Sequence, residues 1–223
     1  MNDLDKFNKE VNKQIGHKFT SENWSGRCPK FYKEDIPNLI KSIEIRKFTK
    51  KESFFCSLSI YSNFKAPNSP KGNKMHPYRQ IFSVALTPDK VTCSSYHWLL
   101  KEDLSYNTNK INLLWEAIKT HGESFFNQFS NFPEPFLDIK PEDFINGDVE
   151  LFDKYEVFHQ VNYINFLKEI HLSLNQSETA VEFSNLAIER LNKTLKAKGV
   201  IIYDKAYKKE YNQYLKFLEM PPT

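Results

Sequence analysis

The stretch FFCSLSIY, residues 54–61, decides the fold class of this chain. Large apolar side chains fill every second position from Phe54 to Ile60, and Phe55, serines and Tyr61 fill the positions between. An alternation with a period of two is typical of a β-strand that has one face on a core and the other toward water. One-sided strands of this kind belong to antiparallel sheets, because the strands of parallel sheets are buried on both faces.

Runs with the same period lie on both sides of this strand and predict an antiparallel sheet over residues 19–98. Short polar connections separate most of them, as in hairpins. The connection at residues 65–77 is longer than a hairpin needs and contains three prolines and a glycine. We therefore predict a loop there, and it is a candidate contact surface. The further runs are residues 31–32, 39–48, 81–86 and 91–98.

Apolar spacings of three and four residues predict helices on both sides of the sheet. One helix covers residues 2–16, where Gly16 is placed to end it. Another covers residues 104–130, closing near residues 121–122 before a short apolar continuation. Prolines prevent regular helix through residues 133–141. Beyond them three more helices are predicted, at residues 149–174, 178–198 and 205–220.

These elements predict an α+β fold in two domains. An antiparallel, one-sided sheet flanked by helices forms the first domain, residues 1–140. A C-terminal helical module of three helices forms the second, residues 141–223, because the proline-rich stretch before it is the best boundary.

Composition narrows the class of protein. The chain has 223 residues, of which 15% are aromatic, so it can form real cores without disulfides or metal. A net charge of +3 makes nucleic acid an improbable partner. Three widely spaced cysteines, no signal sequence and no long apolar run indicate a cytoplasmic chain without a membrane segment.

No motif for catalysis or cofactor binding is present. The six glycines are isolated, so phosphate-binding and dinucleotide-binding loops are absent, and no cofactor is expected. The six histidines form no pair with metal-ligand spacing, so no metal site is predicted. Cys28, between Arg27 and Pro29, is the one cysteine expected to be exposed and mildly activated by a cation. We assign no catalytic residue.

The polar face of the sheet provides the candidate binding residues. Glu44 and Arg46 would share a face with three residues of the neighbouring strand, and an arginine flanked by tyrosine and serine suits an anion or a peptide. Ordinary cross-strand pairing explains the same pattern. His97 and Trp98 end the last predicted strand and could line a cleft, although Trp98 also fits a core position. The candidates are Glu44, Arg46, Ser57, Ser59, Tyr61, His97 and Trp98.

Residues 3–140 resemble the domain-of-unknown-function 4304 family. The resemblance follows the order of an N-terminal helix, Lys18-Phe19, the run at 30–32, the strands at 43–48 and 54–61, and a helix at 115–129. It implies a bacterial α+β protein without assigned activity or catalytic residues. The loop at 65–77 and the longer helical tail depart from the family's pattern.

Three functions remain open from the sequence. We expect a non-enzymatic protein-binding module of the immunity or regulatory-adaptor type, with no oligomeric state indicated. The polar sheet face, the 65–77 loop and tyrosines 207, 211 and 214 of the tail are its contact candidates. The alternative is an enzyme with a cleft between sheet and helices, using Cys28, His97 or Arg46. A weak, salt-sensitive nucleic-acid contact through residues 47–51 is the third.

Overall fold

The structure is a computed structural model that describes residues 2–49, 51–64, 75–101, 103–144, 152–153, 157, 159–197 and 205–220. Its contacts divide the chain into two compact units. Unit 1 contains residues 1–60 and 83–131, and unit 2 contains residues 61–82 and 132–223. This division differs from the predicted boundary after residue 140, because a segment from the middle of the chain groups with the C-terminal helices. No helix of the described chain is both long and apolar enough to cross a membrane.

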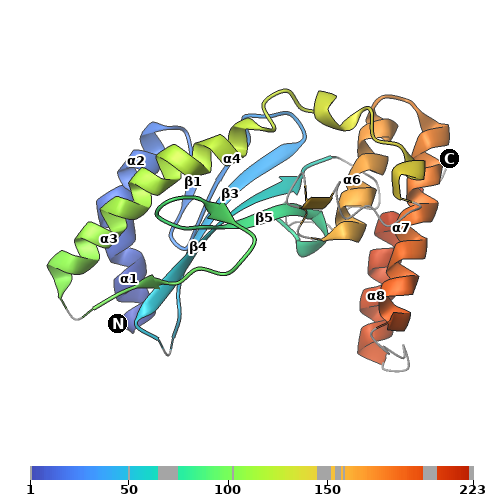
Figure 1. Cartoon of the computed structure of the whole chain (residues 1–223). Coiled ribbons are helices and arrows are strands. Elements are labelled where there is room, and N and C mark those ends of the chain that lie inside the picture. The colour runs from blue at the N-terminus through green and yellow to red at the C-terminus, as the bar shows by residue number, and fades with distance from the viewer. Residues whose placement is uncertain are drawn as a thin grey trace. The chain divides into compact units, whose positions relative to one another are not determined.

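The predicted α+β fold with an antiparallel sheet is confirmed (Figure 1). The strand order is β1-β2-β3-β4-β5-β6, and β7 also pairs with β4. The pairs β1–β2, β2–β3, β4–β7 and β5–β6 are antiparallel. The strands are β1 Ser25–Arg27, β2 Lys30–Lys33, β3 Leu39–Lys47, β4 Ser53–Ser62, β5 Gln80–Leu86, β6 Val91–Thr92 and β7 Trp98–Leu99.

The strand predicted over residues 91–98 is wrong in its extent. β6 ends at Thr92 and β7 begins only at Trp98. Thr92 turns the chain, because its side chain accepts a hydrogen bond from the Ser94 amide, and the residues that follow leave the edge of β5. The chain then returns to pair with the start of β4 instead. Of the loop predicted at residues 65–77, residues 65–74 lie outside the described residues.

The N-terminal helix continues past Gly16, contrary to the prediction. α1 (Asp3–Val11) runs into a π-helical turn (Asn12–Gly16) and then into α2 (His17–Ser21). Its buried residues recur every four positions, which in a regular helix would drift around the axis by about 40° each time. The wider π turn compensates this drift, so Phe7, Val11, Ile15 and Phe19 all stay buried. α2 ends at Ser21, and Asn23 in the turn that follows has a φ of 63° and so takes the role expected of Gly16.

A second continuous helical segment belongs to unit 1. α3 (Leu104–Ala117), a π-helical turn (Ile118–Gly122) and α4 (Glu123–Asn127) follow one another without a break. Asp103 accepts hydrogen bonds from the amides of Ser105 and Tyr106 and so caps the start. The predicted closure near residue 122 is absent. At Gly122 this helical segment instead approaches the sheet closely, since a Cβ there would lie 3.5 Å from Leu58 Cδ1.

Aromatic rings join these helices to the sheet in the core of unit 1. The Phe19 ring stacks on Phe31 of β2 with centroids 3.9 Å apart, and it meets Trp115 of α3 edge-on at 5.1 Å. The Phe54 ring of β4 also contacts two rings, since it is tilted against Phe7 and stacks on Trp98. One face of the sheet is therefore covered, as its alternation predicted.

Unit 2 is built around α6 (Gln160–Ser173), whose residues from Val161 to His171 are all buried. α7 (Ser177–Ala197) and α8 (Lys205–Leu218) complete the helical module (Figure 1). Of the first predicted helix, at residues 149–174, α6 covers residues 160–173, and residues 149–151, 154–156 and 158 lie outside the described residues. Residue 157 instead forms an isolated bridge with Phe82, the last sheet residue of this unit.

Buried polar side chains distinguish the core of unit 2. The Lys168 ammonium donates to the carbonyls of residues 217, 218 and 219 at 2.9, 3.0 and 3.3 Å, so it satisfies the end of α8. Glu169 accepts a 2.5 Å hydrogen bond from the Ser62 hydroxyl. Burial raises the pKa of the Glu169 carboxyl, while Ser62, Lys168 and Arg79 act in the opposite direction. α8 is thus held by hydrogen bonds as well as by apolar contact.

Candidate binding surface on the sheet

The face of the sheet opposite the unit 1 core is the candidate functional site. On β4, Phe54, Cys56 and Leu58 are fully buried, whereas Phe55 and Ser57 between them are partly exposed. On β3, Ile45 is fully buried and the Arg46 side chain is 59% exposed. The predicted alternation of a covered and an open face therefore holds over this half of both strands.

Three aromatic rings meet on the open face. The β4–β7 register pairs Phe54 with Trp98, both buried, so the residues beside them, Phe55 and His97, point to the other side. Phe48 lies between them. Its ring stacks on the His97 imidazole, with centroids 4.7 Å apart and an interplanar angle of 7°, and lies 5.5 Å from the Phe55 ring. Each of the three rings is partly exposed.

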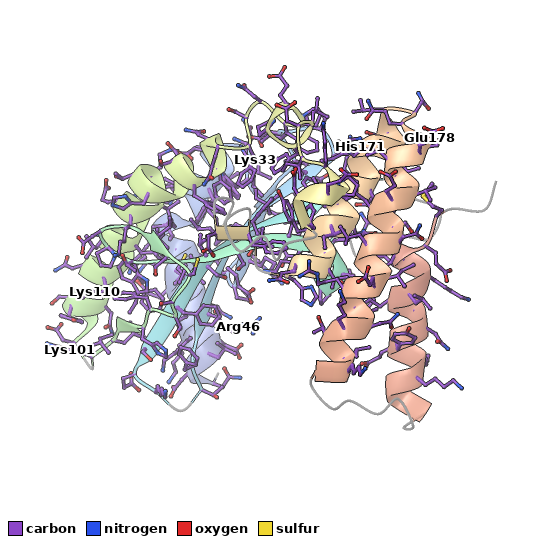
Figure 2. The ribbon with its side chains drawn as sticks, turned by 45° about the vertical axis from the view of Figure 1, so that its right-hand side comes forward. Lys33, Arg46, Lys101, Lys110, His171 and Glu178 are labelled. Atoms are coloured by element: carbon purple, nitrogen blue, oxygen red, sulfur yellow. The ribbon has the colours of Figure 1, made fainter. Side chains whose placement is uncertain are left out.

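Two cations and one apolar side chain extend this cluster. The Arg46 guanidinium lies 5.9 Å from the Phe55 ring, and the Lys51 ammonium lies 5.7 Å from the Phe48 ring. Leu99 of β7 is 61% exposed and, two residues after His97, lies on the same face of the sheet. Figure 2 shows Arg46 on this part of the sheet. We call the set the open-face patch: Arg46, Phe48, Lys51, Phe55, His97 and Leu99.

Glu44 positions Arg46 without taking part in the exposed surface. Its carboxylate accepts a hydrogen bond from Arg46 Nη2 and lies 3.7 Å from Lys30 Nζ. The Glu44 side chain is only 17% exposed. Flanked by two cations, this carboxylate does not make the surface acidic, so Arg46 and Lys51 leave the open-face patch positively charged.

The structure brings together some predicted residues and separates others. Arg46 and His97 belong to the open-face patch, and Glu44 pairs with Arg46. Ser57, two residues after Phe55, lies on the same face of β4. Ser59 is 5% exposed and shares a 3.0 Å hydrogen bond with Ser83, which is the ordinary cross-strand pairing. Tyr61 is also buried and belongs to unit 2. These residues are not available on the surface of the open-face patch.

Trp98 is a core residue. It is 2% exposed, its indole N–H donates to the Leu86 carbonyl at 2.9 Å, and its ring stacks on Phe54. Both the indole N–H and the ring of Trp98 therefore make their contacts inside unit 1. Of the two residues predicted at the end of the last strand, His97 alone faces outward.

The predicted binding residues did not include Phe55 and Leu99, and Phe48 and Lys51 entered only as part of the possible nucleic-acid contact at residues 47–51. A signal for Phe55 was present, because it is an aromatic residue in the row of β4 that otherwise holds serines. No comparable signal marked Leu99, since its exposure depends on the turn that starts β7 after the end of β6. The stacking of Phe48 on His97 joins residues 49 positions apart and depends on tertiary structure.

The cysteine expected to be exposed is buried. Cys28 is 4% exposed, and its Sγ lies 3.3 Å from Asn8 Oδ1 and 3.5 Å from the Ile45 carbonyl oxygen. Burial raises the pKa of the Cys28 thiol to about 12, so Arg27 does not activate it. The expectation of an activated thiol at this position is wrong. Cys56 is likewise buried, and its pKa is raised for the same reason.

The side chains of the open-face patch are better suited to binding another molecule than to catalysing a reaction. Aromatic rings and an arginine, on the strands or directly beside their ends, provide contact area and directional hydrogen bonds. Comparison with protein families, with curated proteins and with solved structures gives no match to this chain. The case for a function therefore depends on the geometry of the site.

Proposed function

We propose that this chain is a non-enzymatic protein-binding module of the immunity or regulatory-adaptor type, acting in the bacterial cytoplasm. The open-face patch is its contact surface. The observation that supports this proposal most is the cluster of three partly exposed rings flanked by two cations. Arginine and aromatic residues are enriched where proteins bind one another.

The charge of the open-face patch specifies the partner's chemistry. Its two charged residues, Arg46 and Lys51, are cations, and Glu44 beside them is already engaged by Arg46 and Lys30. The complementary surface is therefore an acidic protein surface with apolar residues that cover the rings and Leu99. Opposite charges would speed association and orient the two proteins, while the apolar contact would supply most of the affinity.

Charge reversal at exposed positions tests this proposal. We expect the wild-type chain to capture one stoichiometric protein partner from its native host, with acidic residues at the contact. The double variant Arg46→Glu/Lys51→Glu should bind that purified partner at least tenfold more weakly, a change of about 1.4 kcal/mol. Both positions are exposed, and Lys30 remains as a partner for the Glu44 carboxylate, so the fold should tolerate the change.

The matched control reverses two charges elsewhere. Lys209→Glu/Lys216→Glu changes the net charge equally on the exposed side of α8 and should leave the affinity unchanged. Equal binding by the wild type and the Arg46→Glu/Lys51→Glu variant would refute the proposal. Capture of nuclease-sensitive nucleic acid alone would favour the alternative of single-strand binding, in which bases stack on the same rings.

A further inference from the structure

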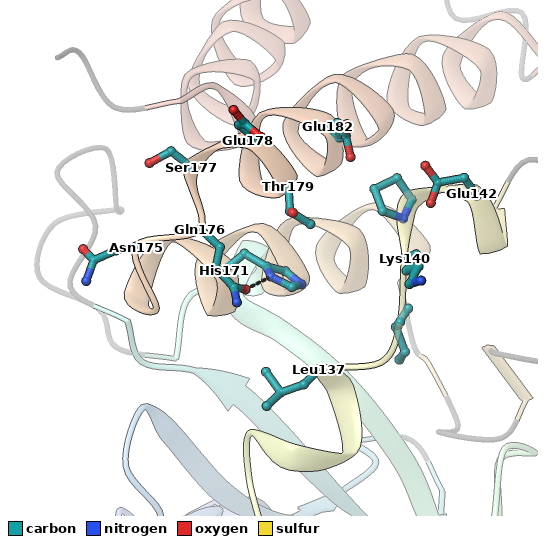
Figure 3. Close-up of a pocket in the computed structure, with 12 residues that line it drawn as sticks. Leu137, Lys140, Glu142, His171, Asn175, Gln176, Ser177, Glu178, Thr179 and Glu182 are labelled. Carbon is teal, nitrogen blue, oxygen red and sulfur yellow. Dashed lines mark hydrogen bonds between the residues drawn. The ribbon is translucent and has the colours of Figure 1, made fainter.

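A pocket of about 700 Å³ lies in unit 2, and it shares no lining residue with the open-face patch. One wall is the segment of residues 137–142, and the other is the turn between α6 and α7 with the first turns of α7 (Figure 3). His171, near the end of α6, lies between the two walls. Every lining residue belongs to the same compact unit and to the described part of the chain.

Hydrogen bonds hold both walls in place. In the first wall, the Lys140 amide donates to Asp143 Oδ2 at 2.8 Å, and Arg190 of α7 donates to the Phe144 carbonyl at 3.0 Å. In the second, the Gln176 amide donates to the His171 carbonyl at 2.9 Å. Hydrogen bonds within unit 2 therefore fix both walls of the pocket.

His171 is the buried polar group of this pocket. It is 5% exposed, its ring stacks on Phe183 at 5.3 Å, and its Nδ1 lies 2.5 Å from Gln176 Oε1. With an amide oxygen as partner, Nδ1 carries the proton in the neutral ring, and Nε2 presents a lone pair. Nε2 has no hydrogen-bond partner among the described residues. A buried acceptor left without a donor is destabilising, and a ligand that donates a hydrogen bond to it would remove that penalty.

The charges around the ring select a cation as that ligand. Glu142, Glu178 and Glu182 line the pocket against a single Lys140, which leaves a formal charge of −2. Figure 3 shows the imidazole reaching from Gln176 toward the side of Lys140, with Thr179 and Glu182 above it. Glu178 already lies in the first turn of α7, where a carboxylate offsets the positive end of the helix.

We propose that this pocket binds a guanidinium or ammonium group, with an N–H of the ligand donating to His171 Nε2 and the glutamates balancing its charge. Nε2 is shielded from solvent, so the ligand reaches it when wall side chains rotate aside. Lys140 and Glu182 are exposed and have room to do so. His171 requires a hydrogen-bond donor and the glutamates favour a positive charge, so the two features together select the ligand.

Titration of the full chain with N-acetyl-arginine methylamide and N-acetyl-lysine methylamide tests the proposal. The chain is uniformly ¹⁵N-labelled, and the resonance of the unprotonated His171 nitrogen and the backbone amide signals are followed by NMR. We expect this resonance and the amide signals of residues 176–179 to move in a saturable manner with at least one of the two probes. The neutral citrulline analogue and N-acetyl-aspartate methylamide should leave them in place. Equal shifts with the citrulline analogue, or saturable binding of the aspartate probe alone, would overturn the proposal.

Exposed carboxylates provide variants that do not disturb the fold. Glu142→Gln/Glu182→Gln should weaken binding of the cationic probe about fivefold, as expected for the loss of exposed charge partners. Glu189→Gln, farther along α7 and paired with Lys193, removes one carboxylate outside the pocket as a control and should bind as the wild type does. No saturable shift with either cationic probe, or an unchanged affinity in the Glu142→Gln/Glu182→Gln variant, would contradict the assignment.

Discussion

At the scale of single residues, burial determines which cysteines can react. Cys28 and Cys56 are buried, whereas Cys93 is exposed. A thiol with a pKa of about 12 forms only about one thiolate in ten thousand at pH 8. We expect one fast-reacting thiol per native chain in an Ellman titration and three after denaturation. The variant Cys93→Ser should remove the fast phase, and a fast phase that persists in this variant would contradict the burial of Cys28.

Lys168 links stability to pH. Burial lowers the pKa of the Lys168 ammonium to about 8, while Glu169 acts in the opposite direction. In the unfolded chain the pKa is about 10.4, so between these two values the unfolded state binds more protons, and stability rises with pH. By pH 9.5 the gain relative to pH 7 is about 2 kcal/mol.

Urea denaturation of the wild type and Lys168→Met isolates this contribution. The free energy of unfolding of the wild type, minus that of the variant, should be larger at pH 9.5 than at pH 7. Taking the difference cancels the other lysines and tyrosines that titrate in the same range. An equal difference at the two pH values would show that Lys168 keeps an ordinary pKa in the folded chain.

The candidate site was predictable where it depends on alternation and not where it depends on tertiary contacts. The alternation of side chains between the two faces of a strand correctly placed Glu44 and Arg46 on the open face of the sheet. The same alternation could not distinguish the partly exposed Ser57 from the buried Ser59, because burial depends on neighbours outside the strand. Nor could it show that His97 would stack on Phe48.

At the scale of elements, two glycines should respond in opposite ways to alanine. Gly122 lies in a helical turn with room for a Cβ, since its nearest neighbour would be Leu58 Cδ1 at 3.5 Å. Gly26 has a φ of +94°, and a Cβ would lie 2.5 Å from the Lys30 carbonyl oxygen. Gly122→Ala should therefore stabilise the chain by about 0.5–1 kcal/mol, and Gly26→Ala should destabilise it by more than about 1 kcal/mol. Urea denaturation measures both, and destabilisation by Gly122→Ala would contradict the described helix–sheet approach.

The existence and type of the elements were predictable, whereas several ends were not. Regular apolar spacing identified the three long strands β3, β4 and β5 and the helices. Gly16 and Gly122 misled the prediction because a glycine inside a helix costs only about 1 kcal/mol, which packing at the π turns offsets. β1 and β7 are too short for periodicity to reveal, and both are defined by the strands they pair with.

At the scale of the whole molecule, the two units are not two halves of the chain. Residues 61–82 supply Ser62, Tyr78, Arg79 and Phe82 to unit 2, where they contact α6 and α8. Tyr78 stacks on Tyr214, and Ser62 satisfies the buried Glu169. A C-terminal module cut out at the proline-rich boundary would leave these groups without their partners.

A fragment of residues 132–223 should therefore not fold by itself. We expect no cooperative urea transition by circular dichroism, in contrast to the full chain. Adding residues 61–82 to the N-terminus of the fragment through a flexible linker should restore at least part of the transition. A cooperative transition of the unextended fragment would show that residues 61–82 are dispensable to unit 2.

Hydrogen–deuterium exchange of the chain bound to its captured protein partner tests the central claim most directly. If the open-face patch is the contact surface, binding slows exchange at residues 44–57 and 97–99 and leaves α7 and α8 unchanged. A footprint confined to unit 2, with residues 44–57 exchanging as in the unbound chain, would contradict the proposed function.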